Sequence, residues 1–190
     1  MLSQIRTAIA NTLKTVSGIG LVHEFQRYST NNSAFKDFFL QDDKVLGWYI
    51  TRITRREQPY SSGYNKVVNT WEIRGFMSLI DGEQSEITAQ NLIENIIQAF
   101  RGDETLGDLI DTTIVDNQAG LQMEEFIPVM FAGVLCHSIR FSLLTRHDEQ
   151  RFKDLEDLTP FETGGVKYDL APKDGQIEAE DIIKPEQPPS

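Results

Sequence analysis

The chain has 190 residues, a formal charge of −11 and one cysteine. This length predicts one domain with an extension, or two small domains, and a body of roughly 150 residues buries about 70% of its unfolded surface. The negative charge argues against nucleic-acid binding as a property of the whole chain. The single cysteine, Cys136, excludes an internal disulfide and a Cys-rich zinc site, and its apolar surroundings predict a small buried side chain.

Apolar runs are short along the whole chain. None reaches the ~18–20 residues that a membrane-spanning helix needs. The first residues also lack the apolar core of a signal peptide. We therefore expect no membrane partner, and a protein that is made or assembled in the cytoplasm.

The N-terminal segment predicts a helix over residues 2–16, followed by a glycine stop at Gly18. Its apolar residues recur at spacings of three and four, which is one stripe of a helix. They are Leu2, Ile5, Ile9, Leu13 and Val16. A first strand is expected over residues 19–28, and the phenylalanines of residues 34–40 favour a short helical turn that packs on a sheet.

Two long strands are expected next, over residues 45–56 and 67–80. Both are rich in aromatic and β-branched residues, and apolar and polar residues alternate in the second. In that strand Trp71 and Ile73 fall on one side, whereas Glu72 and Arg74 fall on the other. Residues 57–65 between the strands contain Pro, Ser, Gly and Asn, which predicts a protruding loop too long for a tight hairpin turn.

The second half of the body predicts one helix and more strands. The helix covers residues 86–101, with Ser85 or Thr88 as its cap. A helical turn at 103–110 and a short strand at 112–115 are expected to follow. A strand at 122–131 is placed at a sheet edge or bulge because of Pro128, and a last long strand covers 133–146.

This element order predicts an α+β fold. We expect a mainly antiparallel sheet with two helices packed on one face and a long β-hairpin, in a domain of residues 1–149. Residues 150–190 are rich in proline and acidic side chains and poor in large aliphatics. We expect them to form an extended or disordered acidic C-terminal arm.

No residue pattern in the chain predicts catalysis, cofactor binding or a metal site. The sequence contains no phosphate-binding loop, no zinc-protease motif and no nucleophile elbow. Cys136 and His137 are adjacent, but neighbours on a strand point to opposite faces, so their side chains are not expected to meet. The acidic pairs Asp42–Asp43 and Glu124–Glu125 are interpreted as solvated loop or strand ends. We therefore predict no catalytic residues, no cofactor-binding residues and no metal ligands.

Two groups of residues predict a protein interface. Arg52, Arg55 and Arg56 place positive charge at the end of a strand in an acidic chain, which favours contact with an acidic partner surface. Tyr60 and Tyr64 lie in the segment that joins the two long strands. Exposed tyrosines are common at interfaces because they are large and amphipathic.

The body also resembles a known family, over roughly residues 1–147. The features that carry the likeness are Ser-Gly-Ile-Gly-Leu-Val-His after the first helix (17–23), Trp-Tyr-Ile-Thr-Arg (48–52) and Trp-Glu-Ile-Arg-Gly-Phe (71–76) in the long strands, the helix Asn-Leu-Ile-Glu-Asn-Ile-Ile-Gln-Ala-Phe (91–100), and the closing Gly-Val-Leu-Cys-His-Ser-Ile-Arg-Phe-Ser-Leu (133–143). In element order and local sequence this resembles the tail terminator, or tail-completion, proteins of long-tailed bacteriophages. The acidic arm is not part of that family's usual core.

The resemblance implies structural work in a virion. Such proteins form a homohexameric ring on the finished tail tube, stop its polymerisation and present a surface to the head–tail connector. The implied partners are further copies of the chain, the tail tube protein, the sheath of contractile tails and the connector or neck protein. DNA is expected to pass through the lumen without specific binding, which agrees with the negative charge. The implied location is the neck region of the tail, after assembly in the host cytoplasm.

Two alternatives remain open from the sequence. The protein is alternatively another neck, head-completion or connector protein, or a tail-tube-like subunit. The other alternative is a small ligand-binding or enzymatic α+β domain. That function needs a concave pocket with convergent polar groups, for which His137 and His23 are the residues to inspect.

Overall fold

The structure is a computed structural model of the chain, and it describes residues 1–27, 32–61, 64–115, 120–150, 164–168 and 179–183. The chain divides into two units, Met1–Arg151 and Phe152–Ser190. The first unit holds both hydrophobic clusters.

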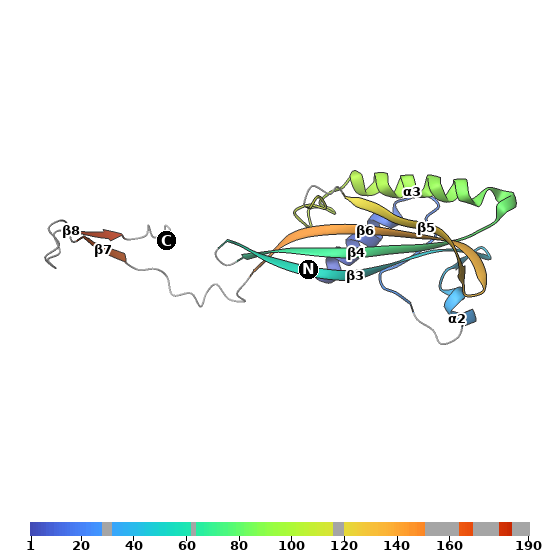
Figure 1. The fold of residues 1–190 in the computed structure, drawn as a ribbon, viewed down its shortest axis with the longest axis horizontal. Helices are drawn as coiled ribbons and strands as arrows, with labels where there is room; N and C mark the ends of the chain where they lie inside the picture. The colour runs from blue at the N-terminus through green and yellow to red at the C-terminus, as the bar shows by residue number, and fades with distance from the viewer. Residues whose placement is uncertain (28–31, 62–63, 116–119, 151–163, 169–178, 184–190) are drawn as a thin grey trace. The chain divides into compact units, whose positions relative to one another are not determined.

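The first unit is an α+β domain built on one mainly antiparallel sheet, as predicted. Its elements are α1 (Leu2–Lys14), β1 (Leu21–His23), α2 (Asn32–Asp37), β2 (Leu40–Gln41), β3 (Lys44–Ser61), β4 (Tyr64–Ser78), η1 (Asp81–Glu83), α3 (Ser85–Arg101), β5 (Leu121–Phe131) and β6 (Val134–Gln150). The strand order is β1-β3-β4-β6-β5, and β2 pairs with the start of β3. All neighbours are antiparallel except β1 and β3 (Figure 1).

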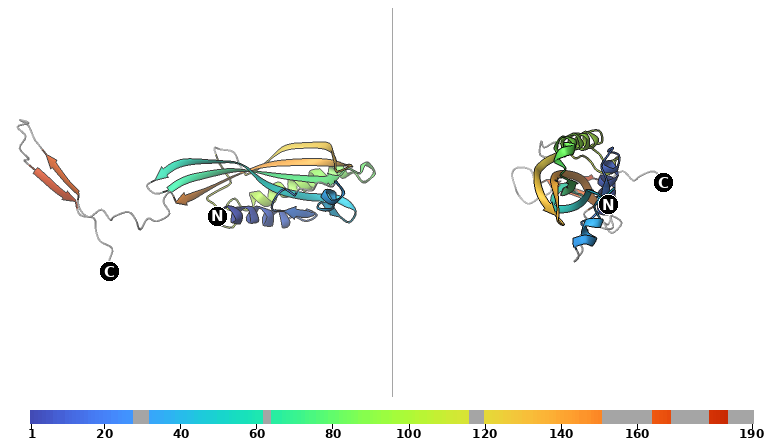
Figure 2. Two further views of the ribbon diagram at one scale, coloured as in Figure 1. Left: turned by 90° about the horizontal axis from the view of Figure 1, so that it is seen from below. Right: turned by 90° about the vertical axis from the view of Figure 1, so that its right-hand side faces the viewer.

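Helices α1 and α3 pack on one face of the sheet, which we call the helix face (Figure 2). Their apolar stripes have the spacing of three and four that brings side chains to one side of a helix. Ile9 of α1 and Ile96 of α3 are fully buried against Trp71 and Ile73 of β4. Trp48 of β3 completes this core, and its indole Nε1 donates a hydrogen bond to the carbonyl oxygen of Ile19 at 2.7 Å.

The opposite face of the sheet carries a smaller aromatic cluster at one end. Phe39, which follows α2, lies edge-on to Phe76 of β4 and Phe131 of β5, at centroid distances of 6.0 and 5.1 Å. Phe76 and Phe131 stack on each other at 4.1 Å. Cys136 is buried in the same cluster, as predicted. Short helix α2 covers this end, and no other helix of the described residues packs on that face.

The prediction of a long loop at residues 57–65 is wrong. β3 continues to Ser61 and β4 begins at Tyr64, so only residues 62 and 63, which lie outside the described residues, separate the strands. Tyr64 and Asn65 pair with β3 on one side and with β6 on the other, and ladder bonds on both sides outweigh turn propensity. Pro59 is tolerated because β1 and β2 pair with β3 only between Lys44 and Tyr49, which leaves Pro59 on an edge.

Four shorter predictions also need correction. β1 is a three-residue strand within the expected 19–28. Residues 103–110 form turns rather than a helix, and residues 112–115 contain isolated bridge positions at Thr112, which pairs with Arg146, and at Val115, instead of a strand. Ser85 is the first residue of α3 and not its cap, because Gln84 holds the cap position in a left-handed conformation. Thr88 lies within the first turn.

The closing strands match the prediction. β5 is an edge strand, and Pro128 sits on it opposite His137. β6 pairs along β4 from Ser78 to Tyr64 and points Ile139, Phe141 and Leu143 into the helix-face core. Leu135 is on the same side of β6 but is exposed, next to the β5–β6 turn.

The second unit contains an antiparallel pair of strands, β7 (Gly164–Tyr168) and β8 (Ala179–Ile183). These strands are the part of the predicted acidic arm that the structure describes. The prediction that residues 150–190 are otherwise extended or disordered falls mainly on residues outside the described ones.

Candidate interaction surfaces

The three predicted interface arginines lie on two different faces of β3. A β-bulge between Arg52 and Thr54 shifts the register against β4. Arg52 therefore lies opposite Trp71 and Arg55 lies opposite Asn69, both on the helix face, whereas Arg56 lies opposite Val68 on the other face. A bulge adds one residue and reverses the alternation beyond it, so the arginines do not form one cluster.

Arg55 forms ion pairs within its own sheet. Its guanidinium pairs with Glu57 two residues along β3, and its Nη2 donates to Oε2 of Glu149 on β6 at 2.7 Å. These side chains are 34% to 51% exposed, so the pairs contribute little stability. They do reduce the positive charge that the sequence had suggested for this strand end.

The two predicted interface tyrosines lie at the end of the β3–β4 hairpin. Tyr64 begins β4 and is 39% exposed. Tyr60 belongs to β3, but its side chain lies outside the described residues. The strands β3, β4 and β6 extend beyond α1 and α3 at this end, so the hairpin projects from the helix-covered body (Figure 2).

An ionic network ties the segment after α3 to this hairpin. Nζ of Lys66 lies 2.7 Å from Oδ2 of Asp111 and 2.6 Å from Oδ1 of Asp148. These hydrogen bonds to carboxylates raise the pKa of Lys66. The backbone N–H of Asp111 also donates to the carbonyl oxygen of Arg146 at 2.8 Å. The segment at Asp111 is thus connected both to β4, through Lys66, and to β6, through Arg146.

Cys136 and His137 point to opposite faces of β6, as predicted. Cys136 is fully buried in the aromatic cluster, and burial raises the pKa of its thiol to about 11. His137 lies on the helix face, where it stacks on Phe126 at a centroid distance of 5.2 Å. The two side chains therefore do not form a Cys–His pair.

His137 does contact a serine, although the sequence did not predict this contact. Its Nε2 lies 3.1 Å from Oγ of Ser85, and the same Oγ accepts a hydrogen bond from the backbone N–H of Ile80 at 2.9 Å. Both side chains are buried, and burial lowers the pKa of His137. The pair joins β6 to the start of α3. Ser85 and His137 are 52 residues apart in the chain, so no local sequence pattern indicated that they meet.

A hollow of about 380 Å³ lies beside this serine–histidine pair. Its lining comes from the end of β4, the first turn of α3 and β6, and comprises Leu79, Gln84, Ser85, Glu86, Ile87 and His137. This is the concave feature near His137 that the enzymatic alternative required. The burial of Ser85 and His137 favours a structural role, because a nucleophile needs access to its substrate.

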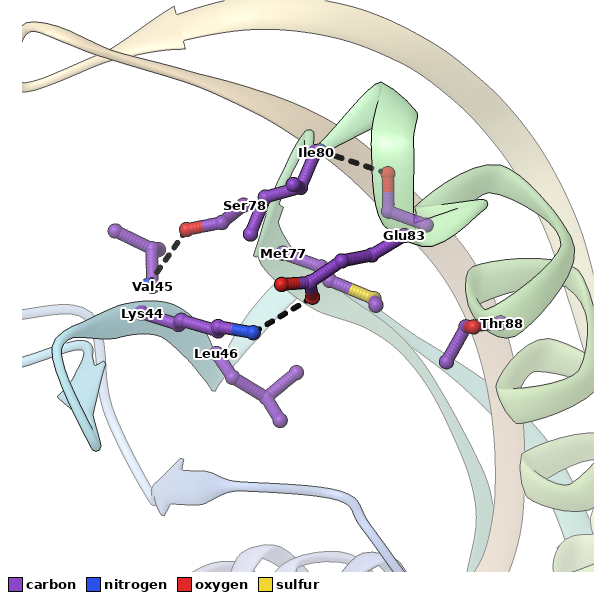
Figure 3. A pocket seen from close by; sticks show the side chains of 9 residues that line it. Lys44, Val45, Leu46, Met77, Ser78, Ile80, Glu83 and Thr88 are labelled. Atoms are coloured by element: carbon purple, nitrogen blue, oxygen red, sulfur yellow. Dashed lines mark hydrogen bonds and ion pairs between the residues drawn. The ribbon is translucent and has the colours of Figure 1, made fainter.

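A second hollow, of about 210 Å³, lies on the other side of the β4–α3 connection (Figure 3). Leu46 and Met77 supply apolar lining, and the ion pair between Lys44 and Glu83, at 2.6 Å, spans it. At this hollow the backbone N–H of Val45 donates a hydrogen bond to Oγ of Ser78 at 2.8 Å. No titratable groups converge there beyond that exposed pair.

Within the described residues, no group of three or more His, Cys, Asp or Glu side chains is placed to hold a metal ion. No helix there is long and apolar enough to cross a membrane. No protein-family model matches the chain, and no curated protein sequence is significantly similar to it.

Exposed apolar side chains gather on the edges of the sheet. On the β5 side they are Met123, Ile127, Met130 and Leu135, and at the opposite edge there is Phe25. Ile53 of β3 is also exposed, and it lines a hollow on the face of the sheet with Thr70 and Glu72. The exposure of these residues was not predicted from the sequence. A signal existed in residues 121–131, where apolar residues fall on both sides of the strand without a period of two.

Proposed function

We propose that this protein is a non-enzymatic structural subunit that assembles into a ring on the tail tube of a long-tailed bacteriophage. The ring stops tube polymerisation and joins the tail to the head connector. The observation that carries the proposal is the placement of α1 and α3 on a single face of an antiparallel sheet. Both sheet edges, part of the other face and the projecting hairpin then remain for neighbouring molecules.

The proposed partners follow from this arrangement and from the family resemblance. Copies of the chain meet at the sheet edges, and a head-to-tail contact repeated by rotation closes a ring. The hairpin with Tyr60 and Tyr64 reaches the tube or the sheath, and the opposite side of the ring meets the connector. The charge of −11 suits a lumen through which DNA slides without binding.

Native mass spectrometry and negative-stain microscopy of the purified chain test the proposal. We expect closed rings of six subunits, either in solution or on added tail tubes. Cryo-microscopy of particles then locates the protein, and a position between tube and head is expected. A protein that stays monomeric with and without tubes contradicts the proposal, as does one found only at the baseplate. A head-side position without tube contact favours the other neck or connector proteins.

The hollow beside His137 is the observation that favours the enzymatic or ligand-binding alternative. Ser85 and His137 are close enough for proton transfer between a hydroxyl and an imidazole. Assay of the purified chain with an activated ester tests this alternative. Turnover that disappears in Ser85→Ala, while ring formation persists, supports an enzyme. Equal background rates for both proteins leave the pair with its structural role.

A further inference from the structure

The edge formed by β5 and α3 carries three exposed apolar side chains near a hollow. Ile87, Met130 and Leu135 are 55%, 68% and 45% exposed. Met130 pairs with Leu135 across the β5–β6 ladder, and the carbonyl oxygen of Leu135 accepts a hydrogen bond from Leu79 N–H at 2.9 Å. Leu79 and Ile87 in turn line the hollow beside His137. The other lining residues of this hollow are polar or charged, namely Gln84, Ser85, Glu86 and His137. We call the hollow together with the exposed apolar side chains beside it the apolar hollow.

The opposite edge carries a projecting aromatic side chain. Phe25 follows β1 and is 54% exposed. The guanidinium of Arg27 lies 5.5 Å from the Phe25 ring and 4.2 Å from the Phe38 ring. The carbonyl of Phe38 in turn contacts Nε2 of His23 on β1 at 2.6 Å. Phe25 and Arg27, which we call the aromatic knob, are thereby attached to the sheet.

The two surfaces are complementary in shape and charge. A hollow of about 380 Å³ falls in the size range of sites that enclose a ligand, so it has room for an aromatic side chain. Glu86 lines the hollow, whereas Arg27 accompanies Phe25. Opposite charges at the rim of an interface select the partner and its orientation.

The sheet also places the two surfaces at a similar height. β1 pairs with Gly47–Tyr49 of β3, and these residues lie opposite Arg74–Phe76, which pair with Ser138–Arg140 of β6. His137 is therefore one row from Leu21 and three rows from His23, the last residue of β1 before Phe25, at the opposite edge of the sheet. A contact between knob and hollow needs a shift of a few residues along the strands, and a ring closes only if the repeated contact adds no net translation.

We propose that the aromatic knob of one copy binds the apolar hollow of the next copy, with Arg27 facing Glu86. This contact rests on the proposed function, since it supplies the head-to-tail interface of the ring. Its two halves are different surfaces of the same chain. A knob-defective and a hollow-defective variant therefore still share one intact contact.

Phe25→Asp and Met130→Asp test the contact separately and together. Each variant alone is expected to lose the rings and remain monomeric, because a charge replaces an apolar group in the contact. An equal mixture is expected to form dimers and nothing larger. Ile53→Asp is the matched control, since Ile53 is 55% exposed and lies in neither surface. Thermal melts confirm that all three variants fold.

Charge reversal gives a second measurement. Arg27→Glu is expected to weaken ring formation at low salt, and the added change Glu86→Arg is expected to restore it. Rings that persist in Phe25→Asp or Met130→Asp, or a mixture that stays monomeric, overturn the contact and leave the ring proposal standing. Wild-type protein that is monomeric at every concentration, with and without tubes, overturns the ring itself and this contact with it.

Discussion

The indole Nε1 of Trp71 donates a hydrogen bond to Oγ1 of Thr145 at 2.9 Å, and both side chains are fully buried. This bond links β4 to β6 in the centre of the helix face. The guanidinium of Arg6 lies 5.8 Å from the Trp71 ring and connects it to α1. Trp71 thus joins three elements that are far apart in the chain.

Trp71→Ala is expected to destabilise the protein by about 3–5 kcal/mol, because it opens a cavity in the core and leaves Thr145 without its partner. Urea unfolding followed by circular dichroism measures the change. Glu72→Ala, at the next residue on the opposite face, is the control and is expected within about 0.5 kcal/mol. Equal effects of the two changes would mean that the assignment of the faces is wrong.

Gly75→Ala is expected to destabilise the protein by about 1–3 kcal/mol. A Cβ at this position would overlap the Trp48 ring, which is fully buried and held by its bond to Ile19. Gly82→Ala is the matched control, since a Cβ there meets nothing within 4 Å. Thermal melts of both variants test the prediction, and an unchanged midpoint for Gly75→Ala contradicts it.

The buried histidines predict a loss of stability on mild acidification. Burial lowers the pKa of both His137 and His147, and for His147 it outweighs the opposing effect of Glu149, whose carboxylate lies 3.9 Å away. The unfolded chain therefore binds more protons than the folded chain below a pH of about 6.5, and stability falls from there until the folded pKa values are passed.

Urea unfolding at several pH values between about 8 and 5.5 measures this loss, before most carboxylates titrate. His137→Gln combined with His147→Gln is expected to give a flatter dependence, whatever its absolute stability. Equal slopes for the wild type and the double variant would contradict the assignment to these histidines.

Cys136 is expected to be inert in the folded protein. With a pKa of about 11 and no exposed surface, its thiol is almost entirely protonated at neutral pH and shielded from reagents. Reaction with a disulfide reagent is expected to be slow in buffer and fast in concentrated urea. A fast reaction in buffer would show that the aromatic cluster opens readily.

The hairpin tyrosines are expected to matter for docking and not for folding. Tyr64→Ser, alone or with Tyr60→Ser, is expected to change stability by no more than about 0.5 kcal/mol, because Tyr64 lies at an exposed strand end. Binding to tail tubes, measured by co-sedimentation, is expected to weaken. Unfolding of the variant would instead place these side chains in a core.

The helices and the strand faces were predictable from the sequence because their signals are local and periodic. Ile5, Ile9 and Leu13 recur with the period of a helix, and Trp71 and Ile73 recur with the period of a strand. All five are buried on the helix face. Burying a stripe of apolar side chains is the main gain of folding, so a regular stripe reports the element that buries it.

The tertiary structure alone decided the rest, because those features depend on residues distant in the chain. Tyr64 and Asn65 belong to a turn-rich segment but form strand because they pair with both β3 and β6. One bulge in β3 places Arg52 and Arg56 on different faces of the sheet. Ser85 meets His137 only because α3 folds back over β6. The sequence by itself determined which residues each element buries, whereas register and strand order determined which surfaces were left for a partner.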